Sequence, residues 1–326
     1  MALPHQVLAS YKFRDPDVTA AGAPRASVRL GVLDTLWFNT GTLCNIECAN
    51  CYIESSPLND RLAYLTAAEV RSYLDEIETL RLGTSEIGFT GGEPFTNPEL
   101  LEMLEDVLSR GFEAQVLTNA MRPLTRPTAC EPLLQLLERY GQSLRLRVSL
   151  DHYTERLHET ERGAGSWAPT LEGLRWLASS GFSISIAGRT CCGECEPDAR
   201  QGYQELFDEL AVGIDTADPS ALVLFPEMDA TADVPEITVD CWGILDTDAN
   251  DMMCANSRMV VKRKDAPSPA VVACTLLPYD PQFELGDRLV DALGVVKLNH
   301  PHCAKFCVLG GGSCSAPAGP GREAVS

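Results

Sequence analysis

The stretch Leu36–Tyr52 reads LWFNTGTLCNIECANCY, and it decides how the rest of the chain is interpreted. It opens with an apolar run typical of a buried strand, and it then places Cys44, Cys48 and Cys51 in a C-x3-C-x2-C pattern. Three thiolates this close together can hold three irons of a [4Fe–4S] cube and leave the fourth iron without a protein ligand. The spacing therefore predicts an iron–sulfur cluster with one open iron.

Zinc and disulfides are the alternatives for closely spaced cysteines. C-x2-C is the commonest half of a structural zinc site, but the second half usually follows about fifteen residues on. Nothing of that kind occurs between Tyr52 and Cys130. A disulfide framework is disfavoured because the chain is long and its start, MALPHQVLASYKFRDPD, lacks the apolar core of a secretory signal. A cluster is therefore favoured, and zinc stays open.

A second motif, SEIGFTGGEPF, occupies residues 85–95. It predicts a short strand that runs into Gly91, Gly92 and Glu93, and Asn97-Pro98-Glu99 then starts a helix. A strand-to-helix turn explains the glycines but not the carboxylate that follows them. Glycines let a ligand approach the backbone closely, and Glu93 can accept a hydrogen bond from a ligand ammonium. We therefore expect this segment to bind a ligand.

The two motifs, taken together and in this order, resemble the radical S-adenosylmethionine (SAM) superfamily. The resemblance implies that Cys44, Cys48 and Cys51 hold the cluster, and that the open iron chelates the methionyl amine and carboxylate of SAM. It implies that the GGEP segment at residues 91–94 contacts the amine. It also implies that one electron, from a flavodoxin- or ferredoxin-type donor, cleaves SAM to methionine and a 5′-deoxyadenosyl radical that abstracts hydrogen from substrate.

The chain up to about residue 229 alternates predicted strands and helices. Beyond the two strands above, the pattern predicts strands at 113–118, 144–150, 182–187 and 221–225, with helices at 67–82, 100–110, 131–140, 171–179 and 199–211. This alternation predicts a parallel sheet with right-handed crossovers. Six strands are too few for a closed eight-stranded barrel. They match the α/β fold that the resemblance implies, an open, partial (β/α)6 TIM-like barrel.

We expect three parts along the chain. An N-terminal extension covers residues 1–30, the barrel covers 31–240, and a small cysteine-rich β-hairpin and loop domain covers 241–326. The tail from Ala316, APAGPGREAVS, reads as disordered or as a flexible lid.

Polar residues follow the strands at the carboxyl ends, where parallel α/β sheets bind ligands. For each one alone, a capping or loop role is the commoner one. By resemblance, Asn119 and Ser149 look like contacts to the ribose and methionyl part of SAM, and Arg189 is a candidate partner for its carboxylate. The candidate catalytic residues facing substrate are Asp151, His152 and Glu227, with Asp229 as a further acid–base candidate that sequence alone cannot rank.

One position departs from the superfamily pattern. An aromatic residue usually precedes the third cysteine and lies near the adenine of SAM, but this chain has Asn50 there, and Tyr52 follows the cysteine. We expect Tyr52 or another group to pack on the adenine, or Asn50 to make a polar contact. The segment His158–Trp167, HETERGAGSW, is similar to a loop after the fourth strand of many relatives.

The last quarter of the chain is rich in cysteine. Two β-branched runs flank the turn KDAPSP and predict a β-hairpin. A glycine-rich loop in HPHCAKFCVLGGGSC then offers backbone N–H groups that can bond cluster sulfurs. This part resembles the twitch and SPASM domains of the superfamily, which implies one auxiliary [4Fe–4S] cluster. A zinc site stays open here too. The favoured ligands are Cys254, Cys274, Cys303 and Cys307, with Cys314 as a competitor.

Other cysteines carry weaker signals. Cys191, Cys192 and Cys195 in TCCGEC follow the fifth strand, and small loop residues or incidental thiols are favoured over ligands there. Cys130 is expected in the core, and Cys241 is unassigned.

Charge limits the partners. A formal net charge of −20 argues against binding to nucleic acid or anionic membranes. No apolar run approaches membrane-spanning length, and we expect a cytoplasmic protein. Only about forty residues precede the first cysteine, too few for a fused peptide-recognition domain.

The expected reaction is hydrogen abstraction from a small molecule or a peptide, giving a net oxidation or bond formation in cofactor or natural-product biosynthesis. The auxiliary cluster either takes an electron from the substrate radical or binds substrate. Two alternatives remain: a ribosomal-peptide maturase with a separate recognition protein, and an iron–sulfur or zinc protein without SAM chemistry.

Overall fold

The computed structural model describes residues 7–190, 193–226 and 229–311. Its main feature is one nine-stranded sheet in the order β10-β9-β8-β2-β3-β4-β5-β6-β7. Strands β2 to β7 are all parallel and follow chain order across the sheet. Their bounds are β2 Thr35–Asn39, β3 Glu86–Thr90, β4 Glu113–Thr118, β5 Leu144–Ser149, β6 Ser183–Arg189 and β7 Leu222–Phe225. The six predicted barrel strands are confirmed.

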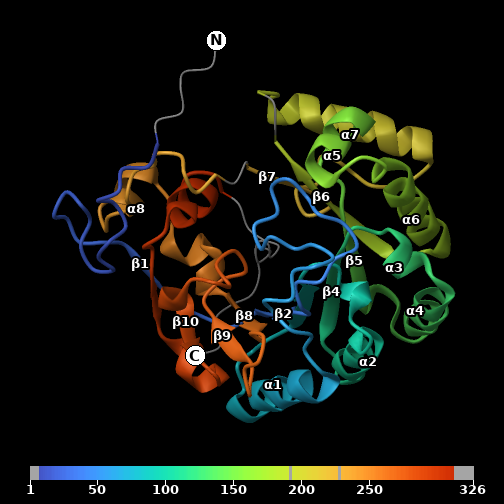
Figure 1. The fold of residues 1–326 in the computed structure, drawn as a ribbon, viewed down its shortest axis with the longest axis horizontal. Coiled ribbons are helices and arrows are strands. Elements are labelled where there is room, and N and C mark those ends of the chain that lie inside the picture. The colour runs from blue at the N-terminus through green and yellow to red at the C-terminus, as the bar shows by residue number, and fades with distance from the viewer. Residues whose placement is uncertain (1–6, 191–192, 227–228, 312–326) are drawn as a thin grey trace.

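Helices cross over between these strands and cover one face of the sheet (Figure 1). Strand β7 has only β6 as a neighbour among the described residues, so the sheet stays open and the predicted partial barrel is confirmed. No helix of the described part is long and apolar enough to cross a membrane. The bounds are α1 Ala67–Leu80, α2 Leu100–Ser109, α3 Arg122–Thr125, α4 Pro127–Tyr140, α5 Glu155–Arg162, α6 Trp167–Ser180, α7 Glu196–Leu210 and α8 Cys241–Leu245.

Local signals explain most of the helix ends. Thr66 and Glu69 form the predicted capping box at the start of α1. Helix α4 begins four residues earlier than predicted, with Pro127 at its first position, where the missing N–H costs nothing. Helix α5 occupies half of the segment predicted as a loop, and the prediction was wrong there. Its sequence has one fully buried side chain, His158, so it lacks the apolar periodicity that predicts a helix.

The C-terminal hairpin joins the barrel sheet. Strands β8 (Ser257–Val261) and β9 (Ala270–Val272) form the predicted hairpin, and β10 (Glu284–Gly286) extends it. Because β8 pairs in parallel with β2, the hairpin continues the main sheet and does not form one of its own. It thereby covers the edge of β2, which would otherwise expose unpaired backbone groups.

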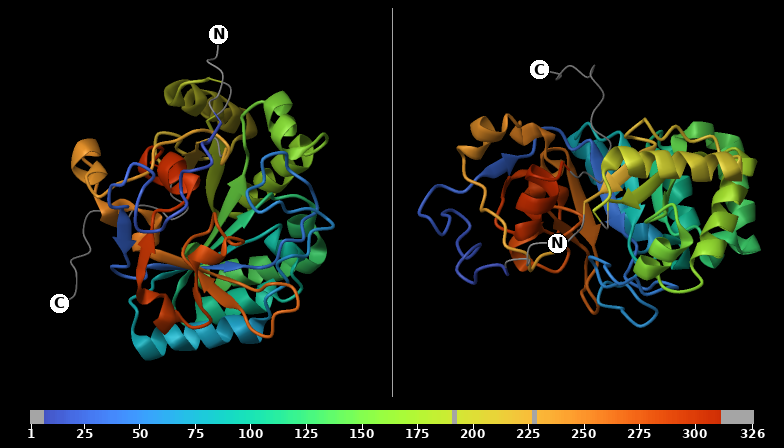
Figure 2. Two further views of the ribbon diagram at one scale, coloured as in Figure 1. Left: turned by 60° about the vertical axis from the view of Figure 1, so that its left-hand side comes forward. Right: turned by 90° about the horizontal axis from the view of Figure 1, so that it is seen from above.

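A strand from the N-terminal extension and a strand from the C-terminal part pair beside this hairpin. Strand β1 (Ser27–Arg29) of the N-terminal extension pairs with β11 (Val295–Lys297). A second apolar core forms between these segments and the sheet, and it includes Trp37 of β2 and Phe306 of a short π-helix, Cys303–Val308. In Figure 2 the orange and red C-terminal part lies at the β2 side of the barrel, next to the blue N-terminal segment.

Candidate active site

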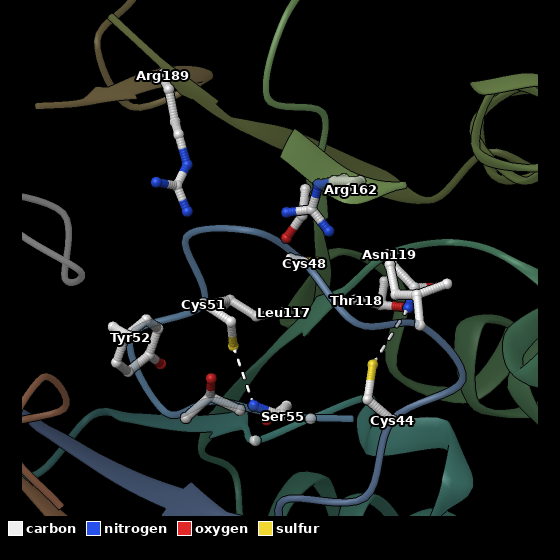
Figure 3. A pocket seen from close by; sticks show the side chains of 15 residues that line it. Cys44, Cys48, Cys51, Tyr52, Ser55, Leu117, Thr118, Asn119, Arg162 and Arg189 are labelled. Atoms are coloured by element: carbon white, nitrogen blue, oxygen red, sulfur yellow. Dashed lines mark hydrogen bonds between the residues drawn. The ribbon is translucent and has the colours of Figure 1, made fainter. Parts of the chain in front are cut away.

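The three cysteines of the opening motif lie on the loop that follows β2. All three line a cavity of about 120 Å³ at the carboxyl ends of the strands, together with Gly91 and Gly92. Figure 3 shows the residues that line this cavity, with Arg162 next to Cys48 and the Asn119 side chain facing Cys44. The structure therefore brings the two sequence motifs together at one site.

The surroundings of the thiols fit an iron–sulfur cluster. The Asn119 side chain donates to Cys44 Sγ at 3.9 Å, and the Ser55 backbone N–H donates to Cys51 Sγ at 3.3 Å. The hydroxyl of Ser55 is buried in the cavity wall without a partner among the described residues, and can donate to a cluster sulfur. Within the described residues no three potential ligands are arranged around a single metal ion. Cluster thiolates each bind a different iron.

Burial keeps the thiols of Cys44 and Cys48 protonated when no metal is bound. It raises the pKa of Cys44 to about 12, and it raises the pKa of Cys48, where the nearby Arg162 opposes it. Only a thiolate is a metal ligand, so iron must displace these protons. Arg162 then lies beside the negative charge that forms.

Close contact between two backbones explains the glycines. Gly92 N–H donates to Gly41 O at 2.8 Å, and Glu93 N–H donates to Leu43 O at 3.2 Å. A Cβ atom on Gly92 would lie 2.2 Å from Leu43 O. Gly91 has a φ of +144°, a backbone angle that residues with a Cβ atom rarely adopt. The Gly-Gly turn thus lets the cysteine loop pack directly against the end of β3, and it also lines the cavity.

Glu93 has protein partners in place of the expected ligand amine. Its carboxylate accepts from Asn119 N at 2.8 Å, from Thr118 Oγ1 at 2.9 Å and from Phe95 N at 3.2 Å. Burial raises its pKa to about 7, although these three donors oppose the shift. The side chain is 1% exposed and is not among the residues that line the cavity. Glu93 therefore ties the end of β3 to the end of β4.

Asp151 lies between two arginines. Arg162 Nε is 3.0 Å from Asp151 Oδ2, and Arg189 Nε is 3.5 Å from Asp151 Oδ1. Burial alone would raise the pKa of Asp151, but the two guanidinium groups outweigh it and hold the pKa below its usual value. A carboxylate held in this way is a poor proton acceptor, which argues against the predicted catalytic role. Arg162 was missed by sequence reasoning because it ends the unpredicted helix α5.

Replacing Arg162 leaves Asp151 buried with one partner fewer. We expect Arg162→Met to lower the free energy of unfolding by about 3 to 5 kcal/mol, the usual cost of breaking a buried ion pair. Urea unfolding measures this. Arg288→Met is the control, since Arg288 pairs with Glu76 at the surface, and it should cost about 1 kcal/mol or less. Equal losses in the two variants would contradict the assigned role of Arg162.

A second cavity of about 110 Å³ adjoins the first and lies where the C-terminal part meets the barrel. Five residues line both cavities: Tyr52, Leu117, Ser149, Arg162 and Arg189. Asp151 lines only the second cavity, whose remaining wall is apolar and comes from segments far apart in the sequence: Ala187, Phe225, Pro226, Leu276 and Phe306.

Asn50 and Tyr52 flank the third cysteine and have different surroundings: Asn50 bonds to neighbouring segments, and Tyr52 lines the cavity. The Asn50 side chain donates to Glu161 Oε2 at 2.8 Å, and the Asn50 backbone carbonyl accepts from Arg189 Nη2 at 3.2 Å. Asn50 thus links the cysteine loop to α5 and β6. Tyr52 is the aromatic residue in the cavity wall.

The remaining catalytic candidates lie away from both cavities or outside the described residues. His152 Nδ1 accepts from Thr154 N at 2.9 Å, its Nε2 is 3.5 Å from Glu194 Oε2, and it lines neither cavity. Asp229 accepts from the backbone and hydroxyl of Thr231 and lines neither cavity. Glu227 lies outside the described residues.

His158 makes stability depend on pH. Its ring is fully buried with neither nitrogen bonded among the described residues, and burial lowers its pKa from about 6.5 to about 4. In the unfolded chain, His158 therefore takes up a proton at a higher pH than in the folded chain. The free energy of unfolding is not reduced by His158 above pH 6.5, and it falls progressively as the pH drops from 6.5 to 4.

We expect His158→Phe to flatten the pH dependence of unfolding. The phenyl ring keeps the edge contact with Trp167 (ring centroids 5.5 Å apart in the native pair) but cannot titrate. The variant should lose less stability than the native chain between pH 6.5 and 4, by up to about 3 kcal/mol. Urea unfolding across this range measures the difference. Parallel curves for both proteins would rule out a titrating His158.

Four of the predicted auxiliary ligands gather in the second core. Cys254 and Cys303 belong to it, and Cys274 and Cys307 pack against it. Burial raises the pKa of Cys254 to about 11 and raises the pKa of Cys303 well above its ordinary value. Repulsion from Cys274 and Cys254 adds to the shift at Cys303, so these thiols are neighbours.

The other cysteines are placed elsewhere. Cys130 lies on α4 and donates to Leu124 O, Cys195 is exposed at the start of α7, and Cys241 begins α8. Cys314, Cys191 and Cys192 lie outside the described residues.

The fold and the site define a class: open parallel α/β barrels with a three-cysteine loop after the first barrel strand, built to hold an iron–sulfur cluster. Residues 38–199 match the model of the radical SAM superfamily, and the chain belongs to that superfamily. Members bind SAM and a [4Fe–4S] cluster, so the predicted cofactors of the first site are confirmed at the level of the family.

Curated relatives share the barrel part. The subtilosin biosynthesis protein AlbA of Bacillus subtilis is 33% identical over 145 residues, 44% of this chain and 30% of AlbA. The mycofactocin maturase MftC of Mycobacterium ulcerans is 28% identical over 140 residues, 43% of this chain and 35% of MftC. The chain thus spans about a third of the length of these relatives.

Solved structures share the fold over a longer range. Streptococcus suis SuiB bound to its precursor peptide SuiA matches 79% of this chain and 63% of SuiB, with a TM-score of 0.57 and 10% identity. The protein anSMEcpe with bound AdoMet matches 81% of this chain and 83% of its own, with a TM-score of 0.56 and 13% identity. At this identity the likeness concerns the fold.

Proposed function

We propose that this chain cleaves SAM reductively and uses the resulting radical to abstract hydrogen from a peptide side chain in natural-product biosynthesis. One observation carries the proposal: Cys44, Cys48 and Cys51 line the same cavity as the Gly-Gly turn that follows the next strand. When bound there, the cluster supplies the electron that breaks the sulfonium bond of SAM.

The residues around the cavity have separate tasks in this proposal. Asn119 and Ser149 offer polar groups in the wall for the ribose and methionyl part of SAM, and Tyr52 offers a ring for the adenine. Arg189 is the candidate partner of the SAM carboxylate, because its pair with Asp151 is long at 3.5 Å. Arg162 forms the shorter ion pair with Asp151, and its positive charge also offsets part of the negative charge of the thiolates.

The second cavity is the proposed substrate site. It adjoins the first, so a group held there lies next to the place where the radical forms. Its mainly apolar wall favours an aliphatic or aromatic side chain over a sugar, because burying unpaired hydroxyl groups is costly. AlbA and MftC, whose names state bacteriocin biosynthesis and mycofactocin maturation, and SuiB, solved with a precursor peptide, support a peptide substrate.

The C-terminal thiols hold the proposed auxiliary cluster. Leu276 and Phe306 line the second cavity, and each stands within two residues of a proposed ligand, Cys274 or Cys307. Tyr52, which follows Cys51, lines the same cavity, so residues next to both groups of cysteines border the proposed substrate site. This placement supports the transfer of an electron from the substrate radical to the auxiliary cluster, which makes the reaction a net oxidation.

SAM cleavage can be measured without the substrate. The full chain is reconstituted anaerobically with iron and sulfide, reduced with dithionite and incubated with SAM, and 5′-deoxyadenosine and methionine are quantified by chromatography. We expect both products in equal amounts, and neither when iron, dithionite or SAM is omitted. A protein that holds its irons, binds SAM and yet releases neither product would contradict the proposal.

A further inference from the structure

Arg258 on β8 is a buried cation beside the C-terminal cysteines. It is 1% exposed and is among the largest fully buried side chains. Its guanidinium donates four hydrogen bonds, all to backbone carbonyls: Ala292 O at 2.8 Å, Cys254 O at 2.7 Å, Ser257 O at 2.7 Å and Gly294 O at 3.2 Å. The side chain therefore has one fixed position.

The described residues supply no carboxylate for this charge. Arg258 makes no ion pair within 4.0 Å, and the ionisable groups that act on it are the thiols of Cys254 and Cys274. Carbonyl oxygens satisfy the N–H groups but carry no net charge. A buried charge without a counter-ion is costly, because no attraction offsets the loss of its hydration.

A loaded cluster provides the missing charge. Four thiolates around a [4Fe–4S] core leave a net negative charge, which increases on reduction. Cys254 and Cys274, the two thiols that act on Arg258, are both among the proposed ligands. An arginine is suited to this place because its side chain stays protonated in proteins.

We propose that Arg258 is the buried counter-ion of the auxiliary cluster and raises its reduction potential, so that the cluster accepts an electron more readily. This inference rests on the auxiliary cluster of the proposed function. A nearby positive charge stabilises the more negative, reduced state over the oxidised one, and net charge is one of the properties that set cluster potentials. Arg258 is thus a tuning residue that touches neither SAM nor substrate.

The test isolates the auxiliary cluster in the full chain. In a background with Cys44, Cys48 and Cys51 all replaced by alanine, we expect about four irons per chain. A potentiometric titration followed by EPR then gives the midpoint potential. Arg258→Met should lower the equilibrium constant for reduction at least tenfold, which is about 59 mV for one electron. Arg258→Lys keeps the charge and should shift the potential by less than half as much.

The outcomes separate the two claims. A background protein without iron overturns the auxiliary cluster and this inference together, while SAM cleavage by the unaltered chain remains a separate measurement. Four retained irons with an unchanged potential in Arg258→Met overturn the inference alone. If Arg258→Met does not fold, Arg258→Gln replaces it, since glutamine is neutral and can still donate to the carbonyls. The same lowering is expected, and an unchanged potential again overturns the inference.

Discussion

Cys48→Ala is expected to abolish the release of 5′-deoxyadenosine and to lower the iron content from about eight to about four per chain. Cys48 is the middle cysteine of the three in sequence, and it lines the cavity with the other two. Its loss leaves two ligands for three irons. A cluster with fewer thiolates is not held firmly enough to keep one iron open for SAM. The measurement combines iron and sulfide analysis with chromatography of the products.

Cys130→Ala is the matched control. Cys130 is also a half-buried thiol, but it lies on α4 and bonds to Leu124 O, away from the cavity. Iron content and product release should both stay at the native level in this variant. Native-like product release by Cys48→Ala would contradict the assignment of the first cluster.

Gly92→Ala is expected to destabilise the protein by about 3 kcal/mol and to weaken cluster binding. The new Cβ atom would lie 2.2 Å from Leu43 O and 2.8 Å from Thr42 O, which are backbone atoms that cannot rotate away. The cysteine loop must therefore move off β3, which breaks the hydrogen bond from Gly92 N–H to Gly41 O. Urea unfolding and iron analysis after reconstitution measure the two effects.

Gly243→Ala provides the comparison for this prediction. Gly243 lies on α8, is exposed, and has nothing within 4 Å of the added Cβ. Alanine also favours a helix over glycine, so no loss of stability is expected. If Gly92→Ala folded and bound iron as well as Gly243→Ala does, the Gly-Gly turn would not seat the cysteine loop.

The barrel could be predicted because its signals are local. The strands are short runs, and β2 to β6 each end at a polar residue. The capping box of Thr66 and Glu69 marks a helix start directly. The first site followed from the same logic, since parallel strands bring their carboxyl ends to one edge. Asn119, Ser149 and Arg189 do line the cavity there.

The rest depends on contacts between distant segments. Nothing in the local sequence pairs β8 with β2, so the hairpin was expected in a separate domain. The partners of Glu93 come from the end of β4, and its carboxylate was therefore assigned to a ligand. Arg162 was missed because a helix with one fully buried residue shows no apolar period. The apolar wall of the second cavity combines residues from 117 to 306.

The central claim is that the three cysteines hold a cluster whose open iron binds SAM. EPR spectroscopy of the reconstituted, dithionite-reduced protein tests it most directly, because binding of the SAM amine and carboxylate changes the ligands of that iron. We predict that SAM alters the spectrum of the native chain but not that of the variant with Cys44, Cys48 and Cys51 replaced by alanine. Identical spectra of the iron-loaded native protein with and without SAM would contradict the claim.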